Sequence, residues 1–428
     1  MRTRATLIGS VFFFLLCFQC WAEDNAAKAL SNLWSQLAQP IPNSLGGFFG
    51  TSIAISGNTV VVGQTLSDSG VSGAVFVYVK TTTTNLNNLL PVAVLTPSDG
   101  LGTDAFGTSV AINGDTIVVG DPPFSGCNNC NPGRSYVYVK PAGGWSGNLN
   151  QTAELTASDS ISGALLGSSV SISGNTVVVG APGQGPGAAY VYVEPTNGWV
   201  NAAQTAELTA LSPAGNENLG ASVSISNKTV VAGAPNASGI TAQTGAAYIY
   251  VQPAAGWTNM TQTAKLTASD GVSFDQLGFS VAINGGTVVA GAPAASGVNS
   301  HTGAAYVFTE PAAGWKNETQ SAKLTAPDGV TGDYLGAAVA LLPGTAAAGA
   351  PDRRNGPVDP GGFPGGGAYV FTKSGSSWSS TSVQFLTGSD SHNASLFGSS
   401  VGINGHLLTI GAPYMQKYSG GAFIFTDF

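Results

Sequence analysis

The chain has 428 residues, of which only 14 are basic and 22 are acidic, so charged side chains make up 8% of the sequence. A typical soluble domain carries roughly 25% charged residues. This scarcity excludes coiled coils and charged helical bundles, and it excludes the dense basic surface that nucleic-acid binding requires. The 59 glycines, together with abundant Val, Ala, Ser and Thr, favour an all-β protein rich in tight turns.

The first 22 residues have the pattern of a secretory signal. Arg2 and Arg4 precede an apolar run from Leu7 to Phe18, and Cys20-Trp21-Ala22 provides small residues at a cleavage site. We expect residues 1–22 to be removed on export and residues 23–428 to form one secreted or cell-surface domain. A membrane anchor is the alternative, although the run is short for a span. No later apolar stretch reaches the roughly 20 residues of a transmembrane helix.

A phrase that fills most of the chain recurs seven times. Each copy begins with Phe-Gly or Leu-Gly. Most copies then reach Gly-Ala-Pro through two strand-like runs and continue through a phrase like Gly-Ala-Ala-Tyr-Val-Tyr and a Trp to one like Gln-Thr-Ala-Glu-Leu-Thr-Ala. The first residues of these pairs are Phe49, Phe106, Leu166, Leu219, Leu277, Leu335 and Phe397. A fixed period of this length indicates a solenoid, a propeller or an array.

Four strand-like runs make up each repeat, as the third copy shows. They are Ser168–Ser173, Thr176–Val179, Ala188–Val193 and Gln204–Leu208. The first alternates polar and apolar residues, and the second is a β-branched run typical of a strand buried on both faces. Ser173-Gly174-Asn175 supplies a hairpin turn. Four strands repeated seven times predict a seven-bladed β-propeller of four-stranded antiparallel blades.

The two ends of the chain together have the length of one repeat. The last copy stops after its third strand, and the segment before Phe49 contains Trp34 and Gln36-Leu37-Ala38-Gln39, a shortened match to the Trp and fourth-strand phrase. The sequence therefore predicts that the N-terminal segment supplies the outer strand of the last blade and closes the ring. A short disordered leader is the alternative.

The pairing of Phe/Leu-Gly with a later Gly-Ala-Pro resembles the FG-GAP repeat. Gly-Ala-Pro stands at Gly180-Ala181-Pro182, Gly233-Ala234-Pro235, Gly291-Ala292-Pro293, Gly349-Ala350-Pro351 and Gly411-Ala412-Pro413, while the first two copies keep only Gly63 and Gly120. The wider phrase is most similar to bacterial secreted members. The resemblance implies the seven-bladed propeller found in integrin α-subunit heads, and a role in binding or adhesion.

One part of the integrin-type pattern is missing. Integrin repeats carry an Asp-rich calcium loop between the two motifs, whereas here 14 residues separate Phe/Leu from the Gly of Gly-Ala-Pro in every copy. That length holds two short strands and a turn, which leaves no room for several closely spaced oxygen ligands. We therefore predict no cofactor and withdraw the calcium loops that the resemblance implies.

Acidic residues recur in the links that lead from one repeat to the next. They form the pairs Asp99 with Asp104, Asp270 with Asp275, and Asp328 with Asp333. Carboxylates beside glycine commonly accept backbone N–H bonds in turns. Calcium bound by these pairs is the alternative, which would make them metal ligands.

Loop lengths separate the two faces of the predicted ring. From the Gly of Gly-Ala-Pro to the aromatic residue of the third strand we count 13, 16, 10, 15, 15, 20 and 12 residues, whereas the first hairpin never changes length. Variable loops on a rigid scaffold are common binding sites, although neutral drift also gives variable lengths. On this face we expect Asp352, Arg353, Arg354 and His301 to be candidates for ligand contact.

Cys127 and Cys130 are the only cysteines outside the signal segment. Outside the cell we expect them to form a disulfide that stiffens one loop. A redox site and a zinc site are the alternatives, but the strand–helix context of the former and the nearby histidines of the latter are missing.

A tryptophan recurs at one position in most repeats: Trp145, Trp199, Trp257, Trp315 and Trp378. Repetition at one structural position favours packing over the outer part of each blade. Ligand stacking on a lectin is the alternative.

Two functions from different classes remain. The first is a secreted or surface module, monomeric as a closed ring, that presents its variable loops to an extracellular protein or glycan. The second is a lectin-like propeller or a secreted carbohydrate-active lyase or hydrolase, which would need paired carboxylates at working distance. The sequence shows no catalytic constellation, so we predict binding rather than catalysis.

Overall fold

The structure is a computed structural model. It describes residues 47–66, 73–80, 90–99, 105–123, 131–159, 161–213, 215–239, 241–296, 299–354, 365–388, 395–415 and 420–426. The expected signal segment and the N-terminal segment before Gly47 lie outside the described residues.

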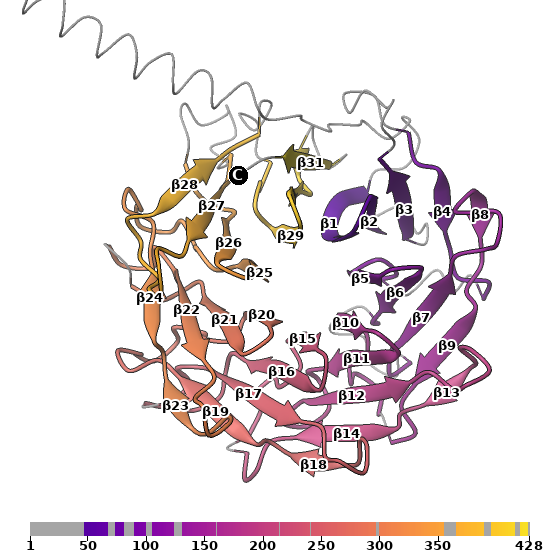
Figure 1. Cartoon of the computed structure of the whole chain (residues 1–428), viewed down its shortest axis with the longest axis horizontal. Coiled ribbons are helices and arrows are strands. Elements are labelled where there is room, and N and C mark those ends of the chain that lie inside the picture. Colours follow the sequence, from indigo (N-terminus) through magenta and orange to yellow (C-terminus); the bar gives the residue numbers. More distant parts are fainter. Residues whose placement is uncertain are drawn as a thin grey trace, which may run out of the picture.

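Seven β-sheets surround a central opening, which confirms the all-β, seven-bladed propeller (Figure 1). The innermost strands are β1 (Gly47–Ser56), β5 (Ser109–Asn113), β10 (Ser169–Ser173), β15 (Ser222–Ser226), β20 (Ser280–Asn284), β25 (Ala338–Leu342) and β29 (Ser400–Asn404). The second strands are β2 (Thr59–Leu66), β6 (Thr116–Asp121), β11 (Thr176–Ala181), β16 (Thr229–Ala234), β21 (Thr287–Ala292), β26 (Thr345–Ala350) and β30 (Leu407–Ala412). They are longer than predicted because the Gly-Ala of Gly-Ala-Pro continues the ladder.

The outer half of each blade follows the same order. The third strands are β3 (Ala74–Val79), β7 (Arg134–Val139), β12 (Ala188–Val193), β17 (Ala246–Val251), β22 (Ala304–Thr309), β27 (Gly367–Thr372) and β31 (Gly421–Thr426). The fourth strands are β4 (Ala93–Leu95), β9 (Ala153–Thr156), β14 (Ala206–Thr209), β19 (Ala264–Thr267), β24 (Ala322–Leu324) and β28 (Val383–Leu386). The last blade has three strands among the described residues, so the predicted outer strand from the N-terminal segment stays a prediction.

A fifth short strand, which the sequence did not predict, lies at the outer edge of the first four blades. These strands are β8 (Gly147–Leu149), β13 (Ala202–Ala203), β18 (Met260–Thr261) and β23 (Glu318–Thr319), and each pairs in parallel with the fourth strand of the preceding blade. The repeated tryptophan precedes this strand. Trp145, Trp199, Trp257 and Trp315 are 6–7% exposed, and Trp257 packs among residues of two successive blades. The packing role is confirmed.

The Phe/Leu-Gly and Gly-Ala-Pro motifs meet at the seam between neighbouring blades. A Cβ atom on Gly233 would lie 1.9 Å from the carbonyl oxygen of Gly278 in the next blade, and Gly278 itself has a φ of +86°. Both positions therefore require glycine, one for close backbone approach and one for its conformation. The same contact joins Gly411 of the last blade to Gly50 of the first, so the seam is alike around the whole ring.

The innermost strands border a channel of about 240 Å³, whose lining includes residues such as Ile55, Ser171 and Leu341. The first strand of each blade has no sheet partner on its inner side, so it would expose unpaired backbone N–H and C=O groups to the channel. Here a hydroxyl of one blade accepts a backbone N–H of the next, as Ser171 Oγ does from Ile225 N at 3.1 Å. The wall of the channel is thereby partly hydrogen-bonded from blade to blade.

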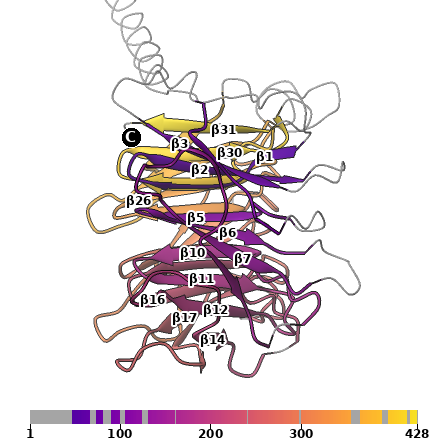
Figure 2. The same ribbon diagram turned by 90° about the vertical axis from the view of Figure 1, so that its right-hand side faces the viewer.

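All strands run between the two flat faces of the ring (Figure 2). The hairpin face carries the turns between first and second strands, which contain two residues in every blade, such as Gly174-Asn175. The loop face carries the connections between second and third strands and the links that enter each blade. The sequence prediction of one uniform face and one variable face is confirmed.

Candidate binding face

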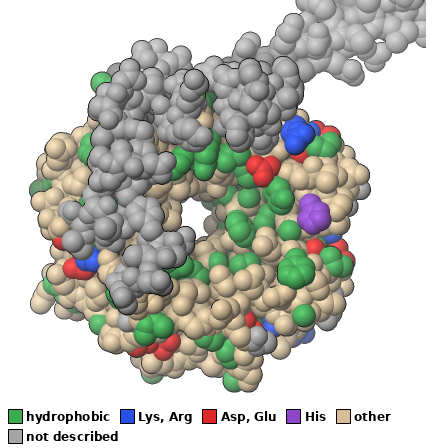
Figure 3. Space-filling model, turned by 180° about the vertical axis from the view of Figure 1, so that it is seen from behind, with side chains coloured by type: hydrophobic (Ala, Val, Ile, Leu, Met, Phe, Trp, Pro, Cys, Tyr) green, Lys and Arg blue, Asp and Glu red, His purple; other side chains and the backbone are tan. Residues whose placement is uncertain are grey.

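Exposed apolar side chains concentrate on the loop face. Figure 3 shows this face, where hydrophobic side chains lie along part of the mouth of the central opening. The links that enter the fifth and sixth blades contribute five large ones: Val272 (55% exposed), Phe274 (65%), Phe279 (44%), Val330 (45%) and Tyr334 (37%). We call these five residues the apolar rim. Exposed apolar groups gathered on neighbouring segments commonly mark an interaction surface.

The loop face also holds most of the strained backbone. Ten described non-glycine residues have a positive φ, and all except Asn227 lie on this face. Phe274 (φ 73°) and Tyr334 (φ 56°) of the apolar rim are among them. Bulky residues adopt this conformation rarely, and such strain tends to occur at functional positions.

Beneath the surface of the loop face, the link into the sixth blade is fixed by a buried arginine. Arg353 Nη2 contacts Asp328 Oδ2 at 2.6 Å and Nη1 contacts Asp333 Oδ2 at 2.7 Å. Tyr369 Oη donates to Asp328 Oδ1 at 2.8 Å, and the guanidinium lies 5.0 Å from the ring centre of Phe385. Arg353 is 8% exposed and Asp333 fully buried. Arg353, expected as a ligand contact, is thus engaged within the protein.

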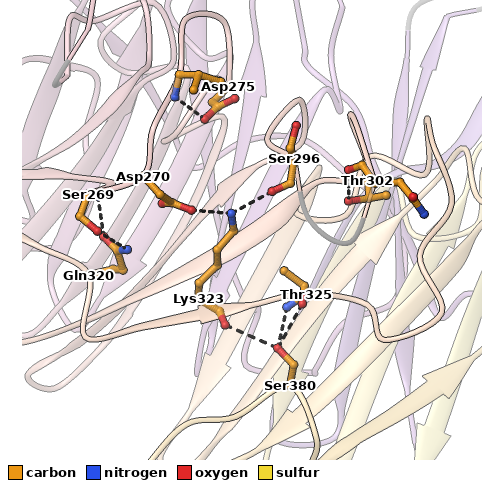
Figure 4. Close-up of polar contacts among 11 residues, drawn as sticks. Ser269, Asp270, Asp275, Ser296, Thr302, Gln320, Lys323, Thr325 and Ser380 are labelled. Carbon is orange, nitrogen blue, oxygen red and sulfur yellow. Dashed lines mark hydrogen bonds and ion pairs between the residues drawn. The ribbon is translucent and has the colours of Figure 1, made fainter.

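The corresponding place in the fifth blade holds a lysine. Lys323 Nζ lies between Asp270 Oδ2 at 2.6 Å and the carbonyl oxygen of Ser296 at 2.9 Å (Figure 4). Burial raises the pKa of the Asp270 carboxyl, but the hydrogen bond and charge of Lys323 outweigh burial and hold it below its usual range. Asp275 accepts the backbone N–H of Val272, and its burial raises the pKa of its carboxyl.

Two further blades hold a basic group in the same surroundings. In the second blade, Arg134 Nη1 contacts Asp99 Oδ2 at 2.9 Å, and Tyr136 Oη donates to the same oxygen at 2.7 Å. In the fourth blade, Lys265 Nζ donates to the Ser238 carbonyl at 2.6 Å and lies 5.3 Å from the ring centre of Tyr248. Burial lowers the pKa of Lys265, and the nearby charge of Glu217 opposes this.

Sequence reasoning missed Arg134, Lys265 and Lys323, and it expected Arg353 in a different role. Lys265 and Lys323 lie directly opposite the third-strand Tyr248 and Tyr306. The signal was available in the repeat, because the residue that follows Ala in the fourth-strand phrase varies between Glu and Lys. The arginines carry no common signal, since Arg134 begins a third strand and Arg353 follows Gly-Ala-Pro.

The other predicted candidates have separate positions. Arg354 is exposed, Asp352 is half-buried with the pKa of its carboxyl raised by burial, and His301 is exposed with its Nδ1 2.8 Å from Ser300 Oγ. Asp104 and the cysteine pair Cys127 and Cys130 lie outside the described residues. Within the described ranges, no three His, Cys, Asp or Glu side chains converge as a metal site would require.

The FG-GAP repeat family matches six segments that together cover well over half of the chain, and the sixth reaches the third strand of blade 6. The matched residues are 44–78, 91–138, 149–192, 202–250, 260–308 and 319–371. The chain belongs to the FG-GAP repeat family. No curated protein matches the sequence. An FG-GAP propeller is a binding or adhesion type of module, and such repeats are typically extracellular. In the part of the FG-GAP chain that the structure describes, no helix has the length and apolarity to cross a membrane.

Proposed function

We propose that this FG-GAP protein is an exported, monomeric binding module that recognises one partner protein through the apolar rim on its loop face. The observation that carries the proposal is the exposure of Phe274, Phe279 and Tyr334, with Val272 and Val330, on the links of two adjacent blades. Aromatic residues are enriched in the centres of protein interfaces, with charged residues at their edges. Arg354 and His301 are exposed groups of these blades on the loop face.

The loops favour a single asymmetric site. The connections between second and third strands differ in length among blades, so the loop face has no sevenfold repetition of one binding residue set. A lectin with one sugar site per blade would be expected to repeat its contact residues. A protein partner can instead use the unequal loops and the apolar rim together.

The proposal is tested by screening the exported chain against an array of purified extracellular proteins and an array of glycans. Each hit is then titrated with two double variants. Phe274→Ser with Phe279→Ser alters the apolar rim, and Val139→Ser with Val200→Ser alters exposed apolar residues towards the hairpin face (38% and 52% exposed).

We expect a protein hit whose affinity falls at least tenfold in the loop-face variant, about 1.4 kcal/mol or more, and is unchanged in the hairpin-face variant. Binding to glycans alone would overturn the protein assignment and favour the lectin-like alternative. A protein hit whose affinity is unchanged in the loop-face variant would overturn the assignment of binding to this face.

A further inference from the structure

The third blade differs from the second, fourth, fifth and sixth blades, in which a basic side chain lies near the carboxylate of the link that enters the blade (the link carboxylate). Asp159 stands seven positions before Leu166-Gly167, at the same offset as Asp270 before Leu277-Gly278. The residue opposite the third-strand tyrosine is Lys265 in the fourth blade and Lys323 in the fifth, but it is Glu207 opposite Tyr190 in the third. Two carboxylates therefore occupy a place where sister blades pair a carboxylate with a cation.

The described part of the chain supplies no cation to this pair. No ion pair of Asp159 or Glu207 occurs among the described residues. The contacts of Asp159 are with neutral amides: Gln204 Nε2 donates to its Oδ1 at 3.3 Å, and Gln184 Nε2 donates to its main-chain oxygen at 3.2 Å. Uncompensated carboxylates that lie close together attract a cation from outside the chain.

A buried hydroxyl adjoins the same two carboxylates. Tyr190 is fully buried, and its Oη, like that of Tyr306 in the fifth blade, has no hydrogen-bond partner within ordinary distance among the described residues. The equivalent hydroxyl of Tyr369 donates to a link carboxylate that is itself paired with Arg353. Burial, followed by the charges of Asp159 and Glu207, raises the pKa of Tyr190 well above its usual range. Burial and the charge of Asp159 raise the pKa of Glu207.

The carboxylates can be reached from solvent. Asp159 is exposed and Glu207 is half-buried. The connection between second and third strands is also the shortest of the seven here, ten residues from Gly180 to Tyr190 against fifteen in the fourth and fifth blades. In those blades the longer connection supplies a carbonyl, from Ser238 or Ser296, to the lysine ammonium.

We propose that Asp159 and Glu207 form an acidic notch that binds an alkylammonium group, supplied by a lysine side chain of the partner protein. The sister blades define the chemistry, because their own lysine ammonium groups lie in the same surroundings, within 2.6 Å of an oxygen acceptor. The notch is on the loop face, so this assignment rests on the proposed function and adds a charged contact to the apolar rim.

The notch is tested first with small probes. Nα-acetyl-lysine amide, its uncharged norleucine counterpart and spermidine are titrated by ligand-observed NMR against the whole exported chain. We expect Nα-acetyl-lysine amide, whose side-chain ammonium is free, to bind with a millimolar Kd, and we expect the norleucine amide not to bind. Affinity for the lysine probe should fall at least tenfold in Glu207→Lys, which restores the residue of the fourth and fifth blades, and in Asp159→Asn. Glu310→Gln, at an exposed site outside the notch, is the matched control and should bind as the wild type does.

Failure of the lysine probe to bind, or equal binding by wild type and Glu207→Lys, would overturn the proposal. Binding of spermidine without binding of the lysine probe would assign the notch to free polyamines and overturn the assignment to a protein side chain. Once a partner is in hand, Glu207→Lys should weaken it at least tenfold. If Glu207→Lys has no effect while Phe274→Ser with Phe279→Ser does, the notch proposal fails and the proposed function stands.

Discussion

The seams between blades and the loop-face clusters above them differ in how strictly they repeat. At each seam a glycine of one blade lies against the backbone of a glycine in the next, and this contact recurs from Gly63–Gly107 to Gly411–Gly50. At the clusters, the cation is an arginine from one of two positions, a lysine, or absent, as in the third blade. The close backbone contact at a seam permits only glycine. A side-chain cluster can be built with different cations or with none. The ring therefore stays constant from blade to blade while its surface chemistry varies.

The largest effect is expected at a seam. Gly233→Ala would place a methyl group 1.9 Å from the carbonyl oxygen of Gly278, and backbone cannot yield as a side chain can. We expect a loss of about 3 kcal/mol or more in the free energy of unfolding, at the upper end for overpacked sites. Chemical denaturation measures this loss.

Gly143→Ala is the matched control, because nothing lies within 4 Å of the place its new methyl group would take and its φ is not positive. The control should leave stability within about 0.5 kcal/mol of the wild type. Equal stability of the two variants would contradict the account of the FG-GAP motifs as a seam.

The next effect is expected in the sixth-blade cluster. Arg353→Met leaves the fully buried Asp333 without its ion-pair partner. Removing one partner of a buried pair costs about 3 kcal/mol, because the remaining charge is uncompensated. Thermal and chemical denaturation should show this loss, while the exposed neighbour Arg354→Met changes stability by less than about 0.5 kcal/mol. A loss shared equally by both variants would show that the cluster does not fix the link.

The smallest expected effects are on the pH dependence of stability, which should differ in sign between the fifth blade (Asp270) and the third blade (Glu207). The lowered pKa of Asp270 means that its carboxylate stabilises the fold above the ordinary carboxyl pKa, and this contribution disappears as pH falls through the lowered value. The raised pKa of Glu207 has the opposite sign, since it favours the fold at low pH and the benefit is lost as pH rises through the raised value.

At pH 7 we therefore expect Asp270→Asn to be less stable than the wild type and Glu207→Gln to be more stable, each by less than about 1 kcal/mol because both sites are partly exposed. Both differences should shrink as the pH is lowered toward 3. Denaturation curves at several pH values check the two signs. A stability change of the same sign in both variants would contradict the proposed difference between the fifth blade, where a lysine pairs with the carboxylate, and the third blade, where no cation does.

The sequence predicted the parts of the molecule that repeat. The seven blades, the two-residue turns such as Gly174-Asn175 and the packing of Trp257 followed from motifs at fixed spacing. The fifth strands escaped prediction because a pair such as Ala202–Ala203 carries no periodicity, and its strand character comes from the neighbouring blade. The clusters escaped prediction because Arg134, Lys323 and Arg353 reach similar surroundings from three different places in the repeat.

The loop-face assignment is tested most directly by comparing two surface variants against one protein partner. The dissociation constant is measured for the wild type, for Phe274→Ser with Phe279→Ser, and for Val139→Ser with Val200→Ser, after equal folding has been verified by thermal denaturation. We expect at least a tenfold loss of affinity for the first variant and none for the second. Equal affinities for both variants, or a loss confined to the second, would contradict it.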